Sequence, residues 1–96
     1  MELYIFARFH VREGCDVEAS AILVDQARRV RGEAGCLNID IFASVRDSQL
    51  FYLHSRWINE AAFDGHAKLR DTLQFVTRME GLIDHPFDVT RSLRLG

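Results

Sequence analysis

The sequence has few cysteines, no clustered metal ligands and no long apolar runs, the features that often stabilise a small protein or anchor it in a membrane. Its 96 residues include only two cysteines, Cys15 and Cys36, and one proline. Two separate cysteines with no histidine at metal-binding spacing do not make the paired clusters of a zinc site, so no metal is expected. No apolar run approaches the ~18–20 residues that cross a bilayer. We therefore expect no association with a membrane.

A surplus of one charge is also lacking. Twelve Lys and Arg oppose fourteen Asp and Glu, which gives a formal net charge of −2. Nucleic-acid binding requires a clustered basic surface, so nucleic acid is not an expected partner. The first residues carry neither the positive segment nor the small-residue cleavage site of a secretion signal. A cytoplasmic protein with reduced thiols is expected.

Length and composition predict one folded domain over residues 1–96, because 48% of the residues are hydrophobic and 27% are charged. A domain of this size buries only about 60–65% of its unfolded surface, so its core is usually supplemented. The common supplements are disulfides, metals and oligomerisation. With the first two not expected, self-association remains.

Hydrophobic periodicity predicts seven elements of secondary structure. Alternation predicts strands over 2–12, 36–45, 50–57 and 87–95, and helical spacing predicts helices over 16–34, 60–66 and about 68–80. Asn59 is the predicted N-cap of the second helix. The order β α β β α α β predicts an α+β, ferredoxin-like split βαβ fold. Such a fold has a four-stranded antiparallel sheet with helices on one face.

Alternation also assigns side chains to the two faces of the sheet. The expected core rows are Leu3, Ile5, Ala7, Phe9 and Val11; Leu37, Ile39, Ile41, Ala43 and Val45; and Phe87, Val89, Leu93 and Leu95. In a monomer the helix-free face should be polar. Here that face is expected to carry Tyr4, Phe6 and Phe42. We therefore expect a homodimer in which a second copy covers the open sheet face.

No residue spacing by itself assigns a reaction, because the sequence has no phosphate loop, HExxH, GxSxG or CxxC motif. The polar candidates for a site are His10, Asn38, Asp40, Tyr52, His54, Ser55, Trp57 and His66. Neighbouring His54 and Ser55 point to opposite faces of a strand, which excludes a nucleophile–base pair. Trp57 fits either the core or a pocket wall, and His66 fits either a solvated helix position or a site. Cys36 has no basic neighbour to activate it.

Two short motifs give the chain a family resemblance. They are Glu33-Ala34-Gly35-Cys36-Leu37 and Trp57-Ile58-Asn59-Glu60-Ala61-Ala62, the latter with His66 nine residues after the tryptophan. With these motifs the chain resembles the antibiotic biosynthesis monooxygenase superfamily over nearly its whole length. The resemblance implies dimers of ferredoxin-like chains, the dimeric α/β barrel. This agrees with the expectation drawn from the apolar open face.

The resemblance also implies an activity, the oxidation by O₂ of a small phenolic or quinol-type substrate without metal or cofactor. The reaction would take place in a pocket between the sheet and the helices. His66 would be the catalytic base or hydrogen-bond donor, Trp57 a pocket wall, and Asn38, Tyr52 and His54 further substrate contacts.

Some positions depart from the family pattern, and two alternatives stay open. Ser55 and Asp71 stand where members usually carry Glu and a second His, and Ala7 stands where the haem-degrading branch has Asn. The first alternative is a non-catalytic dimeric module that binds a small molecule, favoured if no cavity of ~300 Å³ is present. The second is an isomerase of a phosphorylated signalling sugar. Its phosphate would require Arg8, Arg56 or Arg91 in the pocket.

Overall fold

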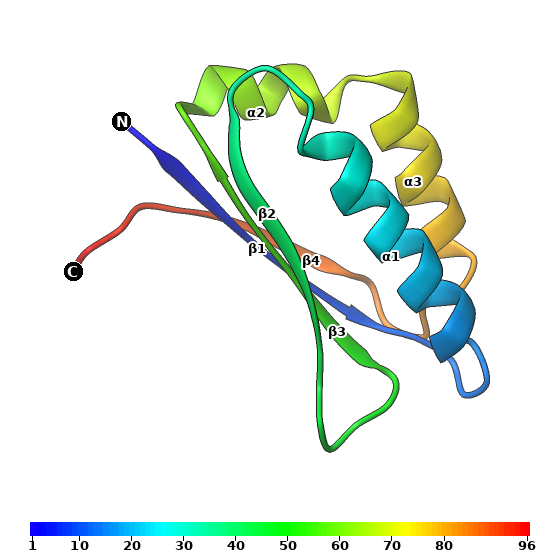
Figure 1. Cartoon of the computed structure of the whole chain (residues 1–96). Helices are drawn as coiled ribbons and strands as arrows, with labels where there is room; N and C mark the ends of the chain where they lie inside the picture. The colour runs from blue at the N-terminus through cyan, green and yellow to red at the C-terminus, as the bar shows by residue number, and fades with distance from the viewer.

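The computed structural model describes all 96 residues and contains the seven elements in the predicted order (Figure 1). They are β1 (Leu3–His10), α1 (Asp16–Val30), β2 (Cys36–Ala43), β3 (Leu50–Trp57), α2 (Glu60–Ala67), α3 (Arg70–Glu80) and β4 (Asp88–Ser92). The Asn59 side chain accepts a hydrogen bond from the Ala62 amide at 2.9 Å, which confirms it as the N-cap of α2.

The four strands form one antiparallel sheet in the order β2-β3-β1-β4, with β1 and β3 in the centre. All three helices lie on one side of the sheet and leave the other side uncovered (Figure 1). This arrangement confirms the predicted α+β, ferredoxin-like fold. None of the helices combines the length and the apolar character that a membrane crossing requires.

The core lies between the sheet and the helices. The predicted row of β1 is buried throughout, and it meets the buried side of β3. The apolar stripe of α1 packs against these strands on the helix side of the core. Its buried residues are Ala19, Ile22, Leu23, Ala27 and Val30. The period-2 and period-3.6 patterns thus predicted the central strands and α1 correctly.

The first helix is four residues shorter than predicted, because it ends at Val30 instead of residue 34. The Glu33 amide donates to the Val30 carbonyl, and the Cys36 amide donates to the Glu33 carbonyl. Gly35 has a φ of +85°, a left-handed conformation that does not continue a helix. Residues 31–35 therefore turn the chain back into β2.

The predicted core rows of the two edge strands are wrong at their ends. In β2 only Ile39 is buried, while Leu37 is 42% exposed and Val45 lies in solvent. β2 has one neighbour only, and a bulge between Cys36 and Asn38 breaks its register. β4 stops at Ser92, which pairs with Tyr4 near the start of β1, so Leu93 and Leu95 have no partner strand and are exposed.

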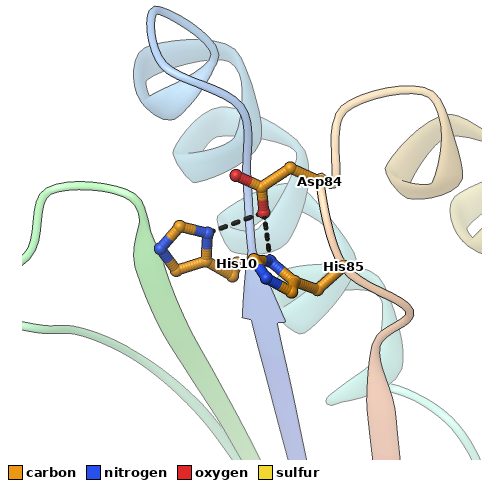
Figure 2. Close-up of side chains that lie close together, drawn as sticks. All are labelled: His10, Asp84 and His85. Carbon is orange, nitrogen blue, oxygen red and sulfur yellow. Dashed lines mark hydrogen bonds and ion pairs between the residues drawn. The ribbon is translucent and has the colours of Figure 1, made fainter.

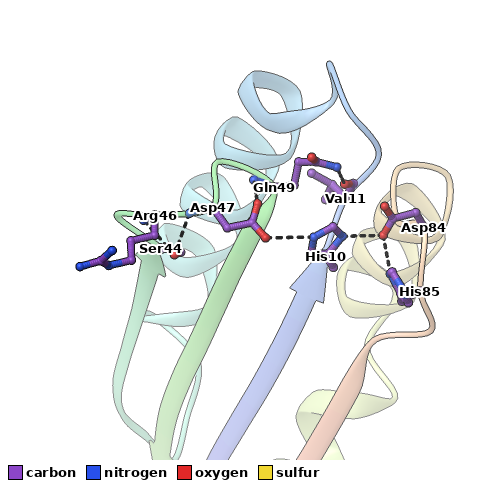
Figure 3. Close-up of polar contacts among 8 residues, drawn as sticks. All are labelled: His10, Val11, Ser44, Arg46, Asp47, Gln49, Asp84 and His85. Atoms are coloured by element: carbon purple, nitrogen blue, oxygen red, sulfur yellow. Dashed lines mark hydrogen bonds and ion pairs between the residues drawn. The ribbon is translucent and has the colours of Figure 1, made fainter.

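A polar clamp joins three segments at the end of β1 (Figure 3). His10 Nδ1 lies 2.7 Å from an Asp84 oxygen, and His10 Nε2 lies 3.1 Å from an Asp47 oxygen. Asp47 is held in turn by the backbone amide of Gln49, whose side chain donates to the Val11 carbonyl. The clamp therefore ties the β2–β3 hairpin and the segment before β4 to the central strand.

The clamp shifts the pKa values of its members in opposite directions. Hydrogen bonds, first to Asp84 and then to Asp47, raise the pKa of His10 above 6.5. The Gln49 amide and then His10 lower the pKa of Asp47, and His10 and then His85 lower that of Asp84. A raised pKa means that the folded protein holds the His10 proton more tightly than the unfolded chain does.

The stability contributed by this clamp should depend on pH. The His10 contribution is complete below pH 6.5 and is lost as the pH rises through the raised pKa of the folded state. The Asp contributions are present above pH 3.8 and are lost as the pH falls through the lowered pKa values. Urea unfolding should therefore show the largest difference in unfolding free energy between the wild type and His10→Gln at pH values between these two limits. A stability difference that grows above neutral pH would contradict the assignment.

Candidate active site

A cavity of about 370 Å³ lies between the sheet and the three helices. Most of its wall is apolar and aromatic, and includes Phe9, Leu53, Phe63, Phe75 and Phe87. The polar residues of the wall are Gln26, Ser55, His66, Thr72 and Arg91. An apolar pocket of this size with a few convergent polar groups is typical of a site for a small organic ligand.

His66 projects from α2 into the cavity wall, where Glu33 holds its ring. The Nδ1 atom lies 2.7 Å from a Glu33 oxygen and 3.3 Å from the Thr72 hydroxyl, and the side chain of His66 is only 10% exposed. No protein group bonds Nε2. A carboxylate on Nδ1 favours the tautomer with the proton there, which leaves the lone pair on Nε2.

Gly35 explains why Glu33 reaches His66. The Ile58 amide donates to the Gly35 carbonyl at 2.9 Å, so the turn before β2 is joined to the start of α2. A Cβ atom on Gly35 would lie 2.6 Å from the Cβ of Ala62. Only glycine permits this approach, and the two sequence motifs therefore form one structural unit.

Trp57 supports the other side of the His66 ring. It is completely buried, with its ring centroid 4.8 Å from that of His66 and 5.7 Å from that of Phe63. Its indole N–H donates to the Ser55 hydroxyl oxygen at 3.0 Å. This bond uses one acceptor position of Ser55 and leaves the hydroxyl proton of Ser55 available to a ligand.

Arg91 forms a closed ion-pair group where the cavity meets solvent. Its guanidinium lies 2.7 Å from Glu60 and 2.8 Å from Asp64, and 4.9 Å above the Phe63 ring. The hydrogen bonds to Glu60 and then Asp64 raise its pKa. Two carboxylates thus surround the one cation, so the group carries a net negative charge.

The other predicted site residues lie on the opposite, open face of the sheet. His54 Nδ1 contacts the Ile5 carbonyl at 3.1 Å, and its ring stacks on Phe6 at 4.7 Å. Asn38 donates to Asp40 at 3.1 Å, and Tyr52 lies opposite Phe42 in the pairing of β2 with β3. Asn38, Tyr52 and His54 therefore do not line the cavity with His66.

Sequence reasoning missed Glu33 as a site residue, together with Gln26 and Thr72. Glu33 is the first residue of its motif, but nothing in the spacing shows that it meets His66, which lies 33 positions further along the chain. Cys36, in the same motif, has its thiol pKa raised by burial, as suits an unreactive cysteine.

Comparison with known proteins places this architecture in a class. Residues 3–78 match the model of the antibiotic biosynthesis monooxygenase family. The chain therefore belongs to this family, which supports a general monooxygenase-like function.

Individual relatives extend the match over the whole chain. It is 27% identical over 92 residues to "Putative monooxygenase YcnE" of Bacillus subtilis (strain 168), covering 96% of this chain and 93% of YcnE. The structure of PA3566 from Pseudomonas aeruginosa is 27% identical with a TM-score of 0.89, covering 99% of this chain and 95% of that one. Rv0793 from Mycobacterium tuberculosis shares the fold with a TM-score of 0.92 at 24% identity, covering 100% and 97%.

The close approach at Gly35 can be tested against a matched glycine. Gly14 also has a φ of +85°, but a Cβ there would meet nothing within 4 Å. Gly14→Ala should lose about 1 kcal/mol of stability through its left-handed conformation. Gly35→Ala should lose roughly 1–3 kcal/mol more through the clash with Ala62. Urea unfolding followed by circular dichroism measures both, and equal losses would contradict the packing role of Gly35.

Proposed function

We propose that the protein oxidises a small phenol or quinol with O₂, without a bound cofactor, in the cavity beside His66. The observation that carries this proposal is the Glu33–His66 pair in an apolar cavity of about 370 Å³. This volume lies near the small end of the ~300–1,000 Å³ typical of ligand sites, which suits a substrate of one to three rings.

His66 is the base of this mechanism. With its proton on Nδ1 directed at Glu33, the Nε2 lone pair accepts the phenolic proton of the substrate. The Glu33 carboxylate then stabilises the imidazolium that forms, because the two charges lie 2.7 Å apart and are only partly exposed to water.

The substrate supplies all the electrons for the oxidation. The phenolate transfers electrons to O₂ and forms a carbon–oxygen bond at an unsubstituted ring carbon. The oxygen–oxygen bond then breaks, one oxygen atom stays on the ring, and the other leaves as water. The phenol loses its hydroxyl hydrogen and the one hydrogen of the reacting ring carbon, and thus becomes a quinone, with one O₂ consumed and one H₂O released.

The cavity wall assists this chemistry by what it excludes. Aromatic side chains such as Phe75 and Phe87 keep water from the phenolate, which leaves its electrons available to O₂. Trp57 holds the His66 ring at a fixed angle, and the Ser55 hydroxyl is placed to donate to a substrate oxygen. These contacts supply orientation and desolvation, and the base supplies the proton transfer.

The sugar-phosphate alternative lacks the free cation that it requires. Arg91 is the one arginine of the cavity wall, and Glu60 and Asp64 already neutralise it. Arg8 and Arg56 project from the open face of the sheet, away from the cavity. The site therefore favours a neutral aromatic substrate over a phosphate ester.

Removal of the base should abolish most turnover. His66→Ala should lower kcat for O₂ consumption by about 10²–10⁴-fold on any hydroquinone or naphthol that the wild type oxidises. Glu33→Gln keeps Nε2 but weakens the support of the imidazolium, and should cause an intermediate loss on the order of 10- to 100-fold. The measurement is an oxygen-electrode assay with quinone absorbance as a second readout.

A matched charge change away from the cavity serves as the control. Asp25→Asn removes an exposed carboxylate that pairs with Arg29 on α1, and should leave turnover unchanged. Full activity in His66→Ala would overturn the proposed mechanism. Binding of the aromatic compounds without any oxygen uptake by the wild type would instead support the non-catalytic module.

We further propose that the protein is a homodimer joined through the open sheet face. Phe6, Phe42 and Tyr52 share this face, and each exposes between 42% and 52% of its surface. Clustered apolar exposure of this kind is typical of an interface. Tyr52 and His54 then act in association, with no direct contact to the cavity.

The dimer can be tested with two exposed apolar residues on opposite sides of the molecule. Phe42→Arg places a charge on the open face. Leu73 is 55% exposed on the outer surface of α3, and Leu73→Arg places a charge there instead. Light scattering should give twice the 11.1 kDa chain mass for the wild type and Leu73→Arg. Phe42→Arg should raise the dissociation constant by roughly 10-fold or more. A wild type that stays monomeric at high concentration would refute the dimer.

A further inference from the structure

Three potential metal ligands meet at the end of the sheet, outside the cavity. His10 ends β1, and Asp84 and His85 precede β4, so the fold alone brings them together (Figure 2). The Nδ1 atoms of His10 and His85 each lie 2.7 Å from the same oxygen of Asp84. One ligand atom from each residue falls within 4.8 Å of the other two.

A fourth side chain orients this group from behind. His10 Nε2 lies 3.1 Å from an Asp47 oxygen, so Asp47 faces the ring nitrogen that is turned away from Asp84 (Figure 3). Asp47 is itself anchored by the Gln49 amide, and its own amide bonds the Ser44 hydroxyl. Histidines that bind metals commonly donate their second nitrogen to a carboxylate in this manner.

We propose that His10, Asp84 and His85 form a binding site for a divalent transition-metal ion, with Asp47 as the positioning residue of His10. Two imidazole nitrogens and one carboxylate oxygen suit Zn²⁺, Co²⁺ or Ni²⁺, with water completing the coordination. Ca²⁺ and Mg²⁺ prefer sets of oxygen ligands and fit this group poorly.

The geometry requires only a small adjustment to hold such an ion. Metal–ligand bonds of about 2.0–2.2 Å place tetrahedral ligand atoms roughly 3.3–3.6 Å apart. The 2.7 Å contacts must open by less than an ångström, and the widest pair, which lies within 4.8 Å, must close by at most about 1.5 Å. The His85 side chain is 66% exposed, so it is free to make this movement.

The site has a role different from that of the cavity, because none of its residues lines the cavity. Its ligands come from the end of β1 and from the segment between α3 and β4, and Asp47 comes from the β2–β3 hairpin. A bound ion would join segments that are far apart in the chain and would stabilise the fold by binding only the folded state.

Calorimetric titration of the metal-free 96-residue protein with ZnCl₂ tests the site, with the visible absorption of bound Co²⁺ as a second measurement. The wild type should bind one ion per chain, and its Tm should rise with the Zn²⁺ concentration. His85→Ala removes an exposed ligand that the core does not need, and should weaken binding at least 10-fold. Asp47→Asn keeps all three ligands and should weaken binding by about 10- to 100-fold.

His66→Ala is the matched control, since it removes a histidine that also contacts a carboxylate but lies in the cavity. It should leave the Zn²⁺ affinity unchanged. Equal affinity in His85→Ala and the wild type would overturn the proposal, and so would loss of binding in His66→Ala alone. A wild type whose Tm does not respond to Zn²⁺ would show that the cluster is an ion-pair clamp only.

Discussion

The contact between Gly35 and Ala62 is the constraint on which the site depends. The turn after α1 can approach the first turn of α2 only because residue 35 has no side chain and adopts a positive φ. This approach carries Glu33 to His66 and seats Trp57 beneath the histidine ring. The two motifs that mark the sequence are therefore the two sides of one contact, and the catalytic candidates follow from it.

Alternation along β3 directs its side chains to two faces of the sheet, one beside the cavity and one on the open face. Ser55 and Trp57 point toward the helices, where Ser55 lines the cavity and Trp57 packs against His66, whereas Tyr52 and His54 point to the open face. Since the side-chain period of a strand is two, a shift of one residue in register would exchange these sets. The pairing of β3 with both β1 and β2 fixes the register and keeps the cavity apart from the proposed dimer surface.

Sequence patterns predicted the elements well because burial follows periodicity wherever a strand has neighbours on both sides. They failed at Leu37, where an edge strand has a bulge, and at Leu93, which lies beyond the end of β4, so both apolar residues are exposed. His66 was predicted from its motif, but its pairing with Glu33 was not. That pairing depends on how a turn and a helix pack in three dimensions, which the spacing of residues along the chain does not predict.

The protein uses histidine beside carboxylates twice, with different chemical consequences. His66 contacts one carboxylate through Nδ1 and keeps Nε2 free within an apolar wall, which is the arrangement of a base. His10 contacts a carboxylate through each nitrogen, which raises its pKa and makes it a clamp between Asp84 and Asp47. The number of engaged ring nitrogens, and not the type of neighbour, therefore determines which histidine can accept a proton from a substrate. The two carboxylate contacts of His10 also explain why this residue, with Asp47 on one side and His85 on the other, is suited to bind a metal ion in place of a ring proton.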